Sequence, residues 1–135
     1  MDGSEIGKKA SVGYDRGRKT HIVDASLFVK EALKVRDLAS KQGFSGAILD
    51  SHLSHLLPKR AVNACIVLNC NLPKLYRRLK KRGYSASKIR ENMDAEIFDT
   101  IFLEASDAGH KIIKINATKL PGSAVKKLAS RIKKL

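Results

Sequence analysis

Three short, largely apolar runs, separated by stretches with helical periodicity, constrain the fold of this chain more than any other feature. The runs are residues 47–49, 64–68 and 111–115, and the first of them is followed directly by Asp50. Strands with an almost continuous apolar sequence are typical of parallel sheets that helices cover on both faces. The pattern therefore predicts an α/β fold with a parallel sheet and flanking helices.

Two helices are predicted from a capping residue at one end and a glycine at the other. The first follows Asp24, runs to about Gln42 and stops at Gly43, with an apolar stripe of Phe28, Ala32, Val35 and Ala39. The second follows Asn71 and ends at Gly83. Both are expected to turn an apolar face to the core.

Two further helices and one segment without a core are predicted from the remaining sequence. One helix starts near Ser85 and carries Ile89, Met93, Ile97 and Ile101 on a single face. The last helix follows Pro121 and is expected to bury Val125, Leu128, Ala129, Ile132 and Leu135. Residues 1–23 are small, polar and basic with four glycines, which predicts a mobile segment rather than a core element.

The charge balance favours a polyanionic partner. The 135 residues include 27 Lys and Arg against 13 Asp and Glu, a formal net charge of +14, which suits RNA, DNA or nucleotide phosphates. We expect neither a membrane span, since no apolar run approaches ~20 residues, nor a secretion signal at the N-terminus. Cys65 and Cys70 are expected on opposite faces of a strand, able neither to pair nor to share a metal, as in a reduced, cytoplasmic protein.

The strongest candidate for chemistry is Asp50, because ligands of open α/β sheets sit beyond the carboxyl ends of the strands. There Asp50 could hold Mg²⁺ through water, and His52 could orient a nucleophile or a phosphate. The alternatives are a polar loop that binds nothing and a transition-metal triad of Asp50, His52 and His55.

A second candidate is the basic segment at residues 76–90, in which Arg82 and Lys88 flank a glycine turn. Such a turn can bring guanidinium groups onto a triphosphate, although a solvated basic face is the plainer interpretation. Two other patterns are not expected to carry chemistry. Residues 3–9 lack the spacing of a phosphate-binding loop, and the carboxylates of Asp94, Glu96, Asp99 and Glu104 suit a solvated helix face.

Several short motifs, taken in order along the chain, resemble the adenylate kinase isoenzyme 6 family, and their wording is closer to its archaeal members. The likeness extends from Gly13 to about Lys119. The motifs are Gly13-Tyr14-Asp15, Ile22-Val23-Asp24, Asp50-Ser51-His52, Arg82-Gly83-Tyr84 with Lys88 and Glu91-Asn92, and Asp94-Ala95-Glu96. The family comprises small nucleoside monophosphate kinases that also act in the maturation of the small ribosomal subunit. The resemblance thus implies a single kinase-like domain over residues 1–135.

The resemblance also implies roles for individual residues. Asp50 takes the Walker B-like position that organises Mg²⁺ through water, and His52 is the adjacent catalytic histidine. Residues 81–91 match the LID, where Arg82 contacts ATP, and Lys119 falls near a residue on the adenine side. Residues 1–23 match the remainder of the monophosphate-binding segment.

Family members begin with a strand, a glycine-rich phosphate loop and a helix that this sequence does not contain, so we expect an N-terminally truncated version whose first βαβ unit is missing. The complete protein is expected to transfer phosphate between ATP and AMP or other monophosphates, with an ATPase activity, a small-subunit platform protein and rRNA as partners, and no membrane. Without the phosphate cradle, the chain as written is expected to be a poor catalyst. The alternative is a basic ribosome- or RNA-binding module without catalysis. A generic DNA-binding domain is disfavoured, because no helix-turn-helix or zinc spacing is present.

Overall fold

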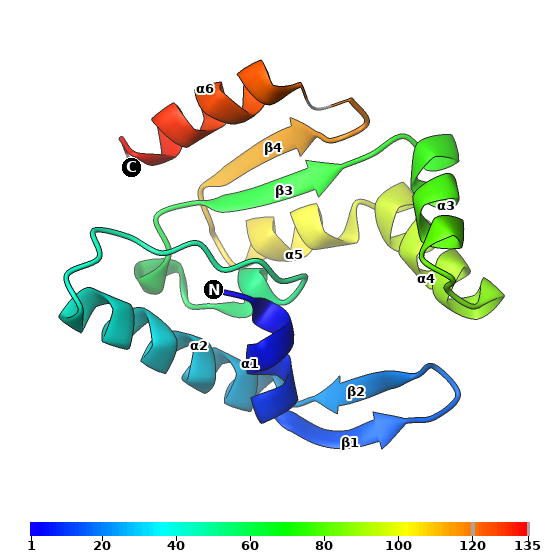
Figure 1. The fold of residues 1–135 in the computed structure, drawn as a ribbon, viewed down its shortest axis with the longest axis horizontal. Helices are drawn as coiled ribbons and strands as arrows, with labels where there is room; N and C mark the ends of the chain where they lie inside the picture. The colour runs from blue at the N-terminus through cyan, green and yellow to red at the C-terminus, as the bar shows by residue number, and fades with distance from the viewer. Residues whose placement is uncertain (120, 135) are drawn as a thin grey trace. The chain divides into compact units, whose positions relative to one another are not determined.

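The computed structural model describes residues 1–119 and 121–134 of the chain (Figure 1). It divides into two compact units, Met1–Ala61 and Val62–Leu135.

The first unit opens with structure where a mobile segment was expected, so the prediction for residues 1–23 is wrong. Helix α1 (Gly3–Lys9) is followed by an antiparallel hairpin of β1 (Ser11–Asp15) and β2 (Thr20–Val23). The Asp2 carboxylate caps α1 by accepting from the backbone N–H of Ser4, and Ile6 and Ala10 are buried. Gly3, one of the glycines that suggested mobility, instead lets the start of α1 lie close against Asp50 and Ser51.

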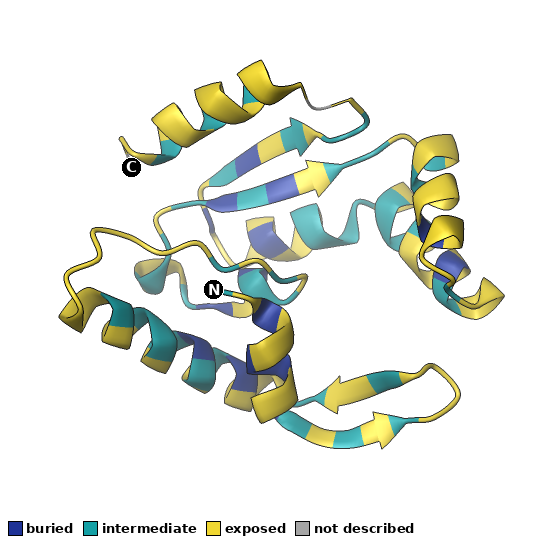
Figure 2. Cartoon of the chain, in the orientation of Figure 1, coloured by how far each residue is buried: buried dark blue, intermediate teal, exposed yellow. Residues whose placement is uncertain are grey.

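Helix α2 (Ala25–Lys41) confirms the first predicted helix. The Asp24 carboxylate accepts from the Leu27 backbone N–H at 2.8 Å, and Gly43 has a φ of +83°, which ends the helix in the left-handed region that suits glycine. Phe28 and Ala32 are fully buried, whereas Val35 and Ala39 are half-buried (Figure 2). The buried stripe is therefore shorter than expected.

Residues 47–49 do not form the predicted strand. The described part of this region holds only an isolated bridge between Asp2 and Asp50, and Ile48 is 63% exposed. A strand needs a neighbour along its length to satisfy its backbone groups, and the start of the chain offers one bridging residue, Asp2, rather than a ladder. Two short 3₁₀ turns, Ser54–Leu56 and Lys59–Ala61, complete the unit.

The second unit holds the parallel pairing that the sequence predicts. Strands β3 (Cys65–Asn69) and β4 (Ile112–Asn116) pair in register from Cys65 opposite Ile112 to Asn69 opposite Asn116. Helix α5 (Thr100–Asp107) packs against both strands (Figure 1) and buries Ala105 beside Cys65 and Val67. Burial raises the pKa of the Cys65 thiol. The α/β prediction is confirmed in a smaller form, a two-stranded parallel sheet with flanking helices.

The helix after Asn71 is confirmed as α3 (Leu72–Lys81), but the helix after Ser85 is not continuous. It divides into α4 (Ala86–Ile97) and α5, and Asp99 between them is left-handed with a φ of +52°. Ile97, predicted to share a face with Ile101, is 54% exposed. The break turns the chain so that Ile101 and Phe102 reach the β3–β4 sheet. Their packing against the sheet outweighs the helical periodicity that continues from Ile89 to Ile101 in the sequence.

Helix α6 (Gly122–Ile132) follows Pro121 as expected but buries no residue. Val125 is 46% exposed, and Leu128 and Ile132 are only half-buried, so the predicted core face is wrong. Leu135 lies outside the described residues. Among the helices described, none is long and apolar enough to span a membrane.

Candidate functional site

The backbone of Asp50 is held from both sides by the start of the chain. Its N–H donates to the Met1 carbonyl at 3.0 Å, and its own carbonyl accepts from the Gly3 N–H at 2.9 Å. The N-terminal ammonium of Met1 donates to the Ile48 carbonyl at 2.7 Å. These bonds fix the main chain at Asp50, while the residue itself remains exposed.

The turn after Asp50 is organised by Ser51. The Ser51 hydroxyl accepts from the Leu53 N–H at 3.1 Å, and its carbonyl accepts from the Ser54 N–H at 3.2 Å. His52 is exposed on this turn, whereas His55 is buried at 4% exposure. The structure thus places Asp50 and His52 on one anchored turn of the first unit.

The donor chemistry at this turn fits Mg²⁺ better than a transition metal. No group of three His, Cys, Asp or Glu side chains gathers for a metal ion in the part of the chain that the structure describes. The proposed triad of Asp50, His52 and His55 is therefore not assembled. Mg²⁺ commonly uses one or two carboxylates and completes its shell with water and substrate phosphates, and the exposed Asp50 carboxylate fits that role.

In the second unit, Arg82 lies at the turn that joins α3 to α4. It caps α3, its N–H donates to the Arg78 and Leu79 carbonyls at 3.1 Å, and Gly83 follows with a φ of +71°. The Arg82 residue is exposed. The turn leaves an exposed arginine at the end of α3, and its contact with phosphate stays a prediction.

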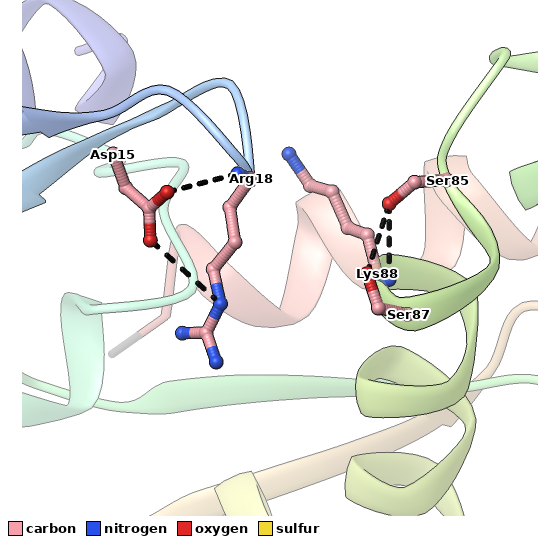
Figure 3. Close-up of polar contacts among 5 residues, drawn as sticks. All are labelled: Asp15, Arg18, Ser85, Ser87 and Lys88. Carbon is pink, nitrogen blue, oxygen red and sulfur yellow. Dashed lines mark hydrogen bonds and ion pairs between the residues drawn. The ribbon is translucent and has the colours of Figure 1, made fainter.

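The start of α4 is fixed by local contacts next to this turn (Figure 3). The Ser85 hydroxyl accepts from the Lys88 N–H at 3.3 Å and lies 3.1 Å from the Ser87 hydroxyl. The Lys88 ammonium lies 4.5 Å from the centre of the Tyr84 ring, a cation–π distance. In the first unit, Figure 3 also shows the Asp15 carboxylate accepting from the Arg18 N–H across the β1–β2 turn.

The carboxyl ends of β3 and β4 are joined by side chains that sequence reasoning assigned to solvent. The Arg78 guanidinium donates to the Ala117 carbonyl at 2.9 Å and contacts the Cys70 sulfur at 3.4 Å. The Glu96 carboxylate accepts from the Cys70 N–H at 2.8 Å. Arg78 stands in a run of basic residues and could not be singled out from the sequence, and nothing in the sequence distinguished Glu96 from its neighbouring carboxylates. Asp99, by contrast, pairs with Lys114, as a carboxylate in a basic chain is expected to do.

Lys119 follows this joined edge. The Thr118 hydroxyl accepts from the Asn71 N–H at 2.8 Å, and the Thr118 N–H donates to the Asn116 side chain at 2.9 Å. These bonds fix the chain just before Lys119, which is exposed. The four predicted site residues therefore divide between the units, with Asp50 and His52 in the first and Arg82 and Lys119 in the second.

Comparison with known proteins agrees with the family resemblance that the motifs suggest. The family model described as AAA domain matches residues 7–99, more than half of the chain. An adenylate kinase isoenzyme 6 homolog from Saccharomyces cerevisiae is 41% identical over 96 residues, which are 71% of this chain and 46% of that protein.

Archaeal and animal proteins match as well. A protein of Pyrococcus abyssi named "Putative adenylate kinase" is 35% identical over 116 residues, 85% of this chain and 58% of its own length. An adenylate kinase isoenzyme 6 homolog from Caenorhabditis elegans is 36% identical over 95 residues, 70% of this chain and 50% of its own length. The chain spans about half the length of these relatives.

Proposed function

The chain belongs to the AAA domain family, and we propose that the whole protein is a nucleoside monophosphate kinase. Relatives named for adenylate kinase isoenzyme 6 confirm the family resemblance that the motifs suggest. The reaction moves the terminal phosphate of ATP to AMP or a related monophosphate and forms two diphosphates. The observation that carries the proposal is the matched range, because residues 7–99 include Asp50, His52 and Arg82.

The roles of these residues follow from their chemistry. The Asp50 carboxylate would hold Mg²⁺ through water, and the metal when bound would neutralise phosphate charge. His52, two residues away on the same anchored turn, would order either the acceptor or a water molecule. Attack by the ordered water would account for ATPase activity. Arg82 would contact the phosphates as a charge-assisted donor, and Lys119 would lie on the adenine side.

The test is the formation of ATP and AMP from ADP with Mg²⁺ by the full-length product of the gene. Asp50→Asn and His52→Ala should each reduce turnover at least about 100-fold, the usual loss when a positioned acid–base or charge-stabilising group is removed. Arg82→Ala should raise the KM for ATP and leave the melting temperature within about 1 °C, as for an exposed residue. Lys41→Ala, which removes an exposed cation at the end of α2, is the matched control and should leave the KM for ATP and the melting temperature unchanged. Unaltered turnover in Asp50→Asn would disprove the role given to Asp50.

A second candidate function is a basic module that binds the pre-ribosome through a small-subunit platform protein and rRNA. The observation that favours it is the net charge of +14, since charge excess of this size suits nucleic acid. RNA binding that needs no ATP and weakens steeply with salt would support this candidate. Magnesium-dependent formation of ATP and AMP from ADP would exclude a purely binding role.

A further inference from the structure

One face of α3 carries a concentration of positive charge, and of its cations only Lys81 lies within residues 81–91, which the resemblance assigns to the LID. Lys74, Arg77, Arg78 and Lys81 line an open depression of about 350 Å³. They stand at helix positions i, i+3, i+4 and i+7, which lie side by side on one face. All four residues are exposed, whereas Leu79 on another face of α3 is buried at 2% exposure.

Three of these four cations have no anionic partner among the residues that the structure describes. Among the ion pairs of the described residues, none includes Lys74, Arg77 or Lys81, and the Arg77 guanidinium donates only to the Pro73 carbonyl within its own helix. Arg78 differs, because its guanidinium is occupied by Ala117 and Cys70 at the end of the sheet. We name Lys74, Arg77 and Lys81 the α3 basic face.

The α3 basic face is unfavourable for the helix that carries it. Helix α3 contains five Lys or Arg residues among its ten and no Asp or Glu. Like charges three or four positions apart destabilise a helix by ~0.2–0.5 kcal/mol per pair. Only cations near the carboxyl end gain from the helix dipole, and Lys74 lies in the first turn. A polyanion laid along the helix would relieve this repulsion.

We infer that the α3 basic face binds the phosphate backbone of single-stranded RNA. Successive cations on one helix face lie ~5–6 Å apart, so a flexible strand that runs along α3 can place consecutive phosphates against them, while a stiff duplex touches a straight helix over fewer phosphates. None of the three side chains is aromatic, so the contact is electrostatic and independent of sequence. The choice of RNA over DNA rests on the second proposed function, whereas the location of the surface does not.

The test is fluorescence anisotropy of the full chain with a labelled, mixed-sequence single-stranded RNA of about 20 nucleotides, longer than the ~4–16 nucleotides typical of one site. The variant Lys74→Gln/Arg77→Gln/Lys81→Gln removes three cations from α3. The matched control, Lys126→Gln/Lys127→Gln/Arg131→Gln, removes three from α6. The α3 variant should make the negative slope of log K against log salt shallower by about 2, as expected for three lost contacts at ~0.7 each, and the control should change it by less than half as much. Equal effects of both variants would overturn the assignment to α3.

A footprint on the unaltered chain keeps the test independent of how the variants fold. RNA should protect Lys74 and Lys81 from acetylation and leave Lys126 and Lys127 reactive, and the reverse pattern would contradict the proposal. Tighter binding of the same-sequence DNA, binding to anionic vesicles instead of RNA, or displacement by ATP beyond its ionic-strength effect would each contradict it too. The anisotropy titrations contain neither nucleotide nor Mg²⁺, and ATP is added only in the separate displacement experiment, so loss of RNA binding and loss of phosphoryl transfer are observed separately.

Discussion

At the residue scale, Gly3 determines whether Asp50 can be held in place. A Cβ atom on Gly3 would lie 2.3 Å from the Ser51 Cβ and 2.6 Å from the Asp50 carbonyl oxygen. Contacts this short force the backbone to shift, and the shift would fall on the bridge between Asp2 and Asp50. Glycine is required here by close approach rather than by a special φ.

We therefore expect Gly3→Ala to destabilise the protein by about 1–3 kcal/mol, the usual cost of overpacking. Gly7→Ala on the same helix is the control, because its added Cβ would meet nothing closer than the Val23 side chain at 3.7 Å. That variant should be neutral or up to ~1 kcal/mol more stable, since alanine favours helix over glycine. Urea unfolding of the two variants measures the difference. Equal stabilities would show that the contact between α1 and the Asp50 turn is not tight.

At the element scale, the sequence predicts where helices end better than it predicts which elements pack or pair with one another. Capping at Asp24 and Asn71 and the glycine stops at Gly43 and Gly83 are local chemistry, and the structure has each of them. Pairing is not local. The bond between the Met1 ammonium and the Ile48 carbonyl joins residues 47 positions apart, so neither the loss of the strand at 47–49 nor the anchoring of Asp50 follows from periodicity. Asp50 and His52 could be selected from the sequence because they follow an apolar run, but the contacts that surround them could not be predicted.

The break between α4 and α5 provides the prediction at this scale. Asp99 holds a φ of +52° there and pairs with Lys114. Asn tolerates the left-handed region and alanine does not, so Asp99→Asn should stay within about 0.5 kcal/mol of the parent while Asp99→Ala loses about 1–2 kcal/mol. Asp94→Ala, on the exposed surface of α4, controls for loss of a carboxylate. Thermal unfolding compares the three, and an Asp99→Ala variant as stable as Asp94→Ala would mean that the left-handed residue does not hold the break.

At the scale of the whole molecule, the excess of positive charge works against the stability of the folded state. The net charge is +14, and a charge far from zero destabilises a compact state through self-repulsion. The described ion pairs offer little compensation. Arg18–Asp15, Lys34–Glu31 and Arg36–Asp37 join residues close in sequence at the surface, and the Lys114–Asp99 pair is partly exposed as well. Exposed pairs of this kind contribute ~0–1 kcal/mol, so their screening by salt costs less than the repulsion that salt removes.

The melting temperature should therefore rise with salt. We expect most of the increase between ~0.01 and ~0.15 M, where the Debye length falls from ~30 to ~8 Å. A gain of ~1 kcal/mol corresponds to about 3–5 °C for a chain of this size. KCl and choline chloride should act equally, because screening depends on ionic strength and not on the identity of the cation. The α3 triple variant, with three fewer positive charges, should start higher and rise less. A melting temperature that falls with salt would show that local ion pairs outweigh the overall repulsion, and it would remove the physical reason to expect that a polyanion stabilises this chain.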